Sequence, residues 1–230
     1  MSYSLCNDYK IKNMRKITDK KELMKLCSFI IMGDGGVYKR NDCVNYQFIM
    51  NMKKENSDYI NYCKDILENI TSCRVFDRVM NNADGHNRKE QLRIETNVHP
   101  FLTKLHDRIY TGTYKGVDPH ALKLLDWECL AILFMSDGCG CIKKGYPDVT
   151  LNMKRLSYGD QLLLKKAFKD KFDLEWNINR QNNYYYLRLR TKDLEKFIKG
   201  IKQYILPSFL YKILNVEPFV IKDSEGGEIV

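Results

Sequence analysis

An apolar segment that ends in an acid and a glycine occurs twice in this chain. CSFIIMGDGG at residues 27–36 is matched by LAILFMSDGCG at 130–140, which places Asp34 and Asp137 at equivalent positions. Further matches follow in the same order: NMK at 51–53 and 152–154, LRIET at 92–96 and LRLRT at 187–191, and Tyr-Lys at 114–115 and 211–212. Ordered matches of this kind indicate two copies of one structural unit.

Each copy is predicted to fold as helix, two strands, helix, two strands, helix, so the fold class is α+β. Asp19 can cap the first helix, whose apolar residues recur at helical spacing, and Asp126 can cap its counterpart. Residues 129–135 are apolar on every side, which predicts a helix buried all round. We place the two repeats at 18–110 and 125–215, a linker at 111–124 and a tail at 216–230, with the repeats packed as one pseudo-twofold body.

Composition excludes several classes of protein. Hydrophobic residues make up 44% and charged residues 29% of the 230, which is typical of a globular protein rather than a disordered one. No apolar run is long enough for a membrane helix, and the N-terminus lacks the apolar core of a secretory signal. The eight cysteines show no zinc-ligand spacing, so we expect reduced, mostly buried thiols inside a cell.

The chain carries a formal net charge of +9, which suggests a polyanionic partner such as nucleic acid. Residues 91–95 and 184–190 alternate between apolar side chains and side chains of Arg, Gln, Glu and Tyr. A strand of this kind is half buried and presents its polar face to solvent or to a ligand. A solvated face explains one such strand equally well, but recurrence in both copies favours a DNA-binding surface.

Each acid is predicted to lie at the C-terminal end of an apolar helix, where the helix dipole disfavours a carboxylate. If the two helices pack together, Asp34 and Asp137 emerge side by side among free backbone carbonyls. Such a set of oxygen ligands suits Mg²⁺. The small residues Gly33 and Ser136 would allow the helix ends to approach closely, and we include both in the expected metal site.

Two acids related by a pseudo-twofold axis match the symmetry of a DNA duplex. Metal-assisted phosphodiester hydrolysis needs oxygen-bound divalent ions that activate water and stabilise the departing oxygen. Lys115 and Lys212, in the matched Tyr-Lys pairs, are candidates for basic groups beside the metal. Either could instead be an ordinary solvated lysine.

The two motifs, CSFIIMGDG at 27–35 and LAILFMSDG at 130–138, resemble the helices that name the LAGLIDADG homing endonucleases. The resemblance covers residues 18–215 and is of the single-chain, two-motif type. It implies two αββαββα repeats whose antiparallel sheets form a saddle over the major groove, and a monomer that cuts a long target across the minor groove to leave 3′ overhangs. Cys27, Gly33 and Ser136 depart from the commoner motif residues, but both acids are present.

By the same resemblance, the metal-binding acids of the family fall on Asp34 and Asp137, with Mg²⁺ or Mn²⁺ as cofactor, and its basic site residues fall on or near Lys115 and Lys212. Strand alternation, together with the residue types that read base edges, nominates nine DNA-contacting residues. These are Gln47, Asn51, Arg93, Glu95, Asn152, Asn177, Asn179, Arg188 and Arg190.

Two alternatives to a nuclease remain on the same scaffold. One is an intron RNA maturase that assists splicing without cutting DNA, and the other is a DNA-binding regulator that has lost cutting. Both acids are retained, which favours the nuclease. The abundance of Lys, Asn, Ile and Tyr is consistent with an AT-rich phage or organelle genome.

Overall fold

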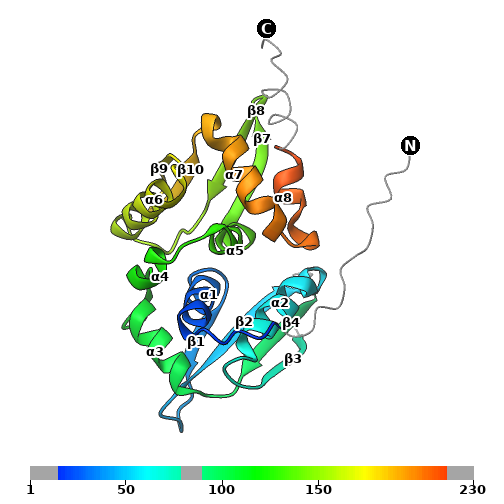
Figure 1. Ribbon diagram of the computed structural model, residues 1–230, viewed down its shortest axis with the longest axis vertical. Coiled ribbons are helices and arrows are strands. Elements are labelled where there is room, and N and C mark those ends of the chain that lie inside the picture. Colours follow the sequence, from blue (N-terminus) through cyan, green and yellow to red (C-terminus); the bar gives the residue numbers. More distant parts are fainter. Residues whose placement is uncertain (1–14, 79–89, 217–230) are drawn as a thin grey trace, which may run out of the picture.

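The computed structural model describes residues 15–78 and 90–216 of the protein. Each repeat has the predicted order of helix, two strands, helix, two strands, helix (Figure 1). The N-terminal repeat consists of α1 (Lys20–Met32), β1 (Gly36–Lys39), β2 (Tyr46–Lys53), α2 (Ser57–Leu67), β3 (Cys73–Arg78), β4 (Gln91–Thr96) and α3 (Pro100–Ile109). The C-terminal repeat consists of α5 (Trp127–Asp137), β7 (Gly138–Lys143), β8 (Tyr146–Leu151), α6 (Tyr158–Phe172), β9 (Trp176–Gln181), β10 (Tyr184–Leu189) and α7 (Leu194–Ile201).

Both predicted helix caps are present. The Asp19 side chain accepts a hydrogen bond from the backbone N–H of Lys21, and the Asp126 side chain accepts one from Cys129. These bonds satisfy N–H groups that lack an intrahelical partner, which fixes where α1 and α5 begin. Residues 15–78 and 90–216 also contain 3₁₀ turns at Lys54–Asn56, Thr191–Asp193, Lys202–Tyr204 and Pro207–Phe209.

The segment expected as a linker contains secondary structure of its own. A short hairpin of β5 (Tyr110–Thr111) and β6 (Tyr114–Lys115) is followed by α4 (Pro119–Lys123). The α4 cap, Asp118, is fully buried and accepts hydrogen bonds from the Ser28 hydroxyl on α1 and from Arg108 on α3. This segment is therefore packed against the N-terminal repeat, and it brings Lys115 to a defined position.

Each repeat contains one four-stranded antiparallel sheet. The strand orders are β1-β2-β4-β3 and β7-β8-β10-β9, so the same topology occurs twice. Helices α2 and α3 pack against β4 and β2 in the first sheet, and α6 packs against β9 and β10 in the second. Because successive side chains on a strand point to opposite faces, one face of each sheet joins the core and the other remains available.

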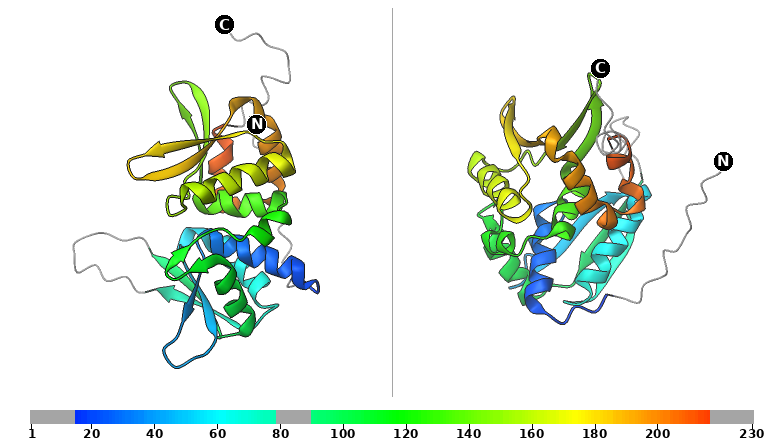
Figure 2. Two further views of the ribbon diagram at one scale, coloured as in Figure 1. Left: turned by 90° about the vertical axis from the view of Figure 1, so that its left-hand side faces the viewer. Right: turned by 45° about the horizontal axis from the view of Figure 1, so that its top comes forward.

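Helices α1 and α5 lie next to each other where the two repeats meet (Figures 1 and 2). From Phe29 to Met32 and from Cys129 to Met135, every residue on these helices is buried, which confirms the prediction of an all-round buried helix in 129–135. At the opposite end of the pair from the acids, Lys25 on α1 forms an ion pair with the α5 cap Asp126. The two repeats thus share a single hydrophobic core.

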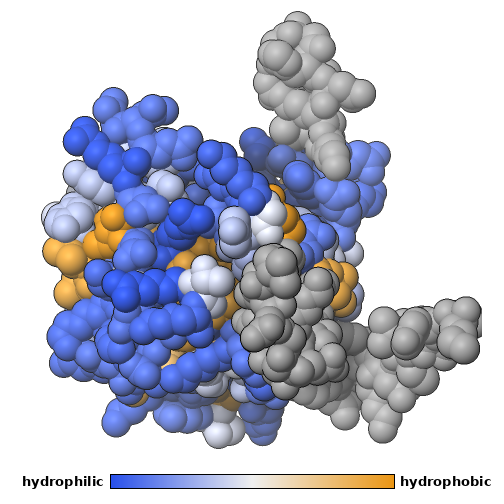
Figure 3. Space-filling view, turned by 90° about the horizontal axis from the view of Figure 1, so that it is seen from above, coloured by the Kyte–Doolittle hydropathy of each residue, from blue (hydrophilic) through white to orange (hydrophobic). Residues whose placement is uncertain are grey.

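The surface is mainly hydrophilic on the face shown in Figure 3. An apolar patch lies at its left, the side on which Figure 1 shows α6, and α6 exposes Leu162 and Leu163. None of the helices in residues 15–78 and 90–216 is long and apolar enough to cross a membrane.

Candidate DNA-cleavage site

The two repeated acids come together at the ends of α1 and α5. Asp34 follows the end of α1 and is exposed, whereas Asp137 is the last residue of α5 and keeps 19% of its side chain exposed. The pKa of Asp137 is raised to about 6, mainly by burial and also by the negative charge of Asp34, against the opposing effect of Arg155. The two carboxylates are therefore close enough to repel each other.

Gly33 and Ser136, the residues before the two acids, meet at the crossing of the helix ends. A Cβ atom on Gly33 would lie 2.4 Å from the Ser136 hydroxyl oxygen and 2.9 Å from its Cβ, closer than real side chains pack. Only glycine leaves room for this approach. The close helix crossing that the sequence predicts is present, and it brings the two acids together.

Lys115 reaches the same point from the hairpin between the repeats. Its ammonium donates to the backbone carbonyls of Gly33 (2.9 Å) and Gly35 (2.6 Å), on either side of Asp34. Burial lowers the pKa of Lys115 to about 7, and the Arg155 charge lowers it too, while Asp137 and Asp34 oppose this shift. The ammonium is therefore within electrostatic reach of both acids.

Lys212 occupies the corresponding position at the end of α5. It lies on α8 (Tyr211–Leu214), is 8% exposed, and donates to the carbonyls of Phe134 (3.2 Å) and Met135 (2.6 Å). Burial lowers its pKa to about 8, while Asp34 and Asp137 raise it. A Cβ on Gly140 in β7 would lie 2.0 Å from the Lys212 carbonyl oxygen, so a glycine there is what lets α8 rest on β7.

Arg155 is a functional candidate that the sequence analysis missed. It lies between β8 and α6, and its guanidinium donates to the carbonyls of Met32 (2.6 Å) and Gly33 at the end of α1. It also lies 3.4 Å from a carboxylate oxygen of Asp137. Its place directly after the repeated NMK motif was the available signal, but a lysine stands at the matching position of the first copy.

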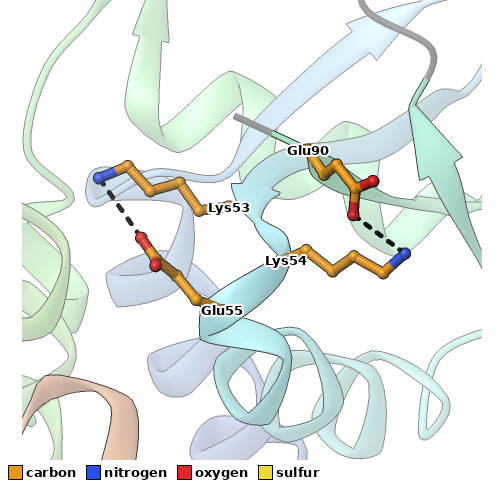
Figure 4. Close-up of a pocket in the computed structure, with 4 residues that line it drawn as sticks. All are labelled: Lys53, Lys54, Glu55 and Glu90. Carbon is orange, nitrogen blue, oxygen red and sulfur yellow. Dashed lines mark ion pairs between the residues drawn. The ribbon is translucent and has the colours of Figure 1, made fainter. Parts of the chain in front are cut away.

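That lysine, Lys54, is held elsewhere. It forms ion pairs with Asp77 (3.0 Å) and Glu90 (3.4 Å) at the edge of the N-terminal sheet. Figure 4 shows it in a pocket lined by Lys53, Lys54, Glu55 and Glu90, with Lys53 paired to Glu55. The basic residue after NMK therefore contacts the paired helix ends in the second repeat and peripheral acids in the first.

The carbonyls around the acids are not free, contrary to expectation. The Gly33 carbonyl accepts from both Lys115 and Arg155, which uses the two lone pairs of that oxygen. The helix-end carbonyls thus serve to hold three cationic side chains in place. Gly33 remains a metal ligand by prediction only, and the carboxylates of Asp34 and Asp137 are the stronger candidates.

The donor set fits a divalent cation bound by oxygen. The raised pKa of Asp137 reflects burial and carboxylate repulsion, and a bound cation would relieve both. No group of three or more His, Cys, Asp or Glu in residues 15–78 and 90–216 is placed to hold a metal, so a cation bound between Asp34 and Asp137 would have at most these two carboxylates as side-chain ligands. Mg²⁺ bound by one or two carboxylates keeps several waters, which suits such a site.

Strand pairing places the expected DNA-contacting residues of the N-terminal sheet on one face. Asn51 is opposite Arg93, and Glu95 is opposite Ile49, two residues from Asn51 and from Gln47. Residues paired across an antiparallel ladder point to the same face, so all four nominated side chains share it. Glu95 is paired with Arg93 and Arg74, which neutralises its charge.

The C-terminal sheet has the equivalent polar face. Arg188 is opposite Asn177 and Thr150, and Tyr186 is opposite Asn179. Asn152 donates to the Thr150 hydroxyl and so lies on the same side. Arg190, which follows β10 and pairs with Glu175, is exposed. The nine nominated residues thus lie on or beside the polar faces of the two sheets.

The family assignment follows from comparison with known proteins. A family model described as the LAGLIDADG DNA endonuclease family matches residues 30–197, more than half of the chain. The chain belongs to this family. The predicted resemblance is therefore confirmed.

Solved structures show the same fold. The homing endonuclease I-WcaI bound to its DNA recognition sequence aligns over 92% of this chain and 96% of its own, with a TM-score of 0.72 and 21% identity. The LAGLIDADG meganuclease I-AabMI bound to uncleaved DNA aligns over 88% and 92%, with a TM-score of 0.55 and 15% identity.

Two curated relatives are named as mRNA maturases rather than as endonucleases. The cytochrome b mRNA maturase bI2 of Saccharomyces cerevisiae is 24% identical over 94% of this LAGLIDADG chain and 55% of its own length. The protein of the same name from Debaryomyces hansenii is 24% identical over 88% of this chain and 77% of its own. The chain thus spans about half the length of the S. cerevisiae relative.

Proposed function

We propose that this chain is a site-specific homing endonuclease that makes a double-strand break in a long DNA target with Mg²⁺ or Mn²⁺. The observation that carries the proposal is the convergence of Asp34 and Asp137, one from each repeat, at the crossing of α1 and α5. A protein that needed only the fold would have no use for two repelling carboxylates at this point. The family resemblance adds cleavage across the minor groove with 3′ overhangs.

The acidic and the basic residues of the site would have different roles in cleavage. A bound divalent cation would polarise the scissile phosphate and supply an activated water. Asp34 and Asp137 would hold that cation. Lys115, Lys212 and Arg155, fixed on the helix-end carbonyls, would offset negative charge on the phosphate in the transition state.

Lys115 and Lys212 are also suited to proton transfer with ordered water. Burial brings their pKa values to about 7 and about 8, so each ammonium can lose its proton near neutral pH. An exposed lysine would stay charged there. Their roles as catalytic residues remain proposals that rest on this placement.

The polar faces of the two sheets are the proposed DNA-binding surface. Their Asn, Gln and Arg side chains suit base edges in the major groove, while lysines around them suit phosphates. Displacement of counterions from the duplex should make binding fall steeply with salt concentration. We propose that the chain acts as a monomer, because its two repeats already supply a two-sided site.

A second candidate function is that of an intron RNA maturase. Two relatives named as cytochrome b mRNA maturases support it, and the same basic surface could serve RNA. Their names also favour an organelle over a phage as the source of the gene. Both functions can coexist in one protein, since cutting requires the acids and RNA binding does not.

The proposal is tested with the DNA that flanks the gene. The joined flanking sequences, without the insert, are placed in a plasmid and incubated with purified protein and Mg²⁺. We expect a single linear product, none in EDTA, and none from a plasmid with a scrambled site. Splicing of the cognate intron RNA is measured in parallel. Splicing that depends on the protein, without any DNA cutting, would replace the nuclease proposal with the maturase proposal.

A further inference from the structure

Two cysteines stand side by side on the polar face of the C-terminal sheet. In β7, Cys139 is opposite Thr150 and Cys141 is opposite Asp148. Thr150 is in turn opposite Arg188 in β10, a nominated DNA-contacting residue. Because directly paired residues share a face, both thiols lie on the surface proposed to meet DNA.

These two thiols differ from the cysteines that are buried in the core. Cys27, Cys63 and Cys129 are buried in the core, and burial raises the pKa of each thiol. Cys139 is exposed and Cys141 half-buried, and burial and then the neighbouring Cys139 thiol raise the pKa of Cys141. A pair of neighbouring accessible thiols is a chelating dithiol, whereas an isolated buried thiol is a small apolar side chain.

The pair is better placed for a bridging ion than for a disulfide. Residues i and i+2 of an extended strand are roughly 6.6 Å apart at about 3.3 Å per residue, near the upper limit of Cα separations in disulfides. A metal ion between two sulfurs, at about 2.3 Å from each, spans a wider gap with less distortion of the strand. Thiolate ligands select soft cations such as Cu(I), Zn²⁺ and Cd²⁺ over Mg²⁺.

We propose that Cys139 and Cys141 form a dithiol site for a soft metal ion, and that an ion bound there competes with duplex DNA for this surface. Each sulfur loses its proton to the buffer as it bonds to the metal, and no oxidation or reduction takes place. The ion and the ligands that complete its coordination would occupy the space above β7 in which the duplex is proposed to bind. The competition rests on the proposed function, whereas the metal site does not.

The metal site is tested with Cd²⁺ as the probe, followed by the ultraviolet absorption of sulfur-to-cadmium charge transfer. We expect one Cd²⁺ per chain with this absorption, and its loss in both Cys139→Ser and Cys141→Ser. Cys43→Ser is the matched control, because Cys43 is also partly accessible but lies in the N-terminal repeat. A thiolate signal that survives in both single variants, or that never forms in the parent protein, would overturn the site.

Competition is tested separately by measuring DNA retention without cleavage, in Ca²⁺, as Cd²⁺ is added. We expect Cd²⁺ to weaken DNA binding at least tenfold in the parent and in Cys43→Ser, and to have little effect in Cys139→Ser. Equal weakening in all three would place the effect at another site. A protein that binds Cd²⁺ through the dithiol but no DNA would refute the DNA-binding proposal and leave the metal site intact.

Discussion

The Arg155 guanidinium, from the C-terminal repeat, donates to the carbonyl of Met32 at the end of α1 in the N-terminal repeat, 2.6 Å away. A charge-assisted bond of this kind ties the two halves together beside Asp137. It also breaks the symmetry of the site, because the matching Lys54 pairs with Asp77 and Glu90 instead.

Replacement of Arg155 should slow cleavage more than it weakens DNA binding. Arg155→Lys replaces the guanidinium, whose Nη2 contacts the carbonyls of Met32 and Gly33, by a smaller ammonium on a different stem, so we expect a drop of about tenfold in the single-turnover rate, and a larger drop for Arg155→Ala. Lys54→Ala is the matched control and should leave that rate within about twofold of the parent. Equal effects at the two positions would show that the asymmetry has no role in cleavage.

The contact between Gly33 and Ser136 can be tested by size. Gly33→Ala places a methyl group 2.4 Å from the Ser136 hydroxyl oxygen and should lower the free energy of unfolding by about 1 to 3 kcal/mol. Ser136→Gly removes the obstructing atoms and should recover much of this loss in the double variant. Strictly additive effects in urea unfolding would mean that the helix ends do not meet as described.

The buried ammonium of Lys115 should make stability depend on pH in a defined direction. The pKa of Lys115 is about 7 in the folded protein, below its usual 10.5. Between these pH values the unfolded chain binds more protons at this lysine than the folded protein does, so the free energy of unfolding falls as pH is lowered from 10.5 toward 7. Between pH 9 and pH 7 the free energy of unfolding should fall by about 1 to 3 kcal/mol from this group. Lys115→Met should flatten this slope, and an unchanged slope would contradict the burial of a charge.

The repulsion between the acids predicts a measurable titration. Carboxyl-carbon NMR of Asp137 without metal should give a pKa of about 6. Asp34→Asn removes the like charge and should lower that pKa, whereas Asp58→Asn should not, because Asp58 is held by Ser208. Since the cation needs the ionised carboxylate, Mg²⁺ affinity should weaken as pH drops below 6. A pKa of Asp137 that is the same in Asp34→Asn would show that the acids lie apart.

Most of the fold could be predicted from the repeated motifs. Helical spacing ending at Asp34 and Asp137, and alternation in 91–95 and 184–190, were enough to predict both repeats and the buried helix pair. The hairpin and α4 in 110–123 were not predicted, because their short elements gain stability from contacts such as that between Ser28 and Asp118. Propensity is weak over so few residues.

The site was predicted in part for a similar reason. The acids and lysines repeat in the sequence and could be matched, whereas Arg155 has a different residue type and a different set of contacts from Lys54. Free carbonyls were expected from the helix ends alone. Three distant basic side chains occupy them, and only the tertiary structure brings these side chains there.

The most direct test compares Asp34→Asn and Asp137→Asn with the parent protein on one target plasmid in Mg²⁺. Each substitution removes one carboxylate from the shared site but keeps a side chain of the same size. We predict that neither variant linearises the plasmid, that any residual product is nicked, and that both still bind the target in Ca²⁺. Linearisation at the parental rate by both variants would contradict a metal site formed by the paired acids.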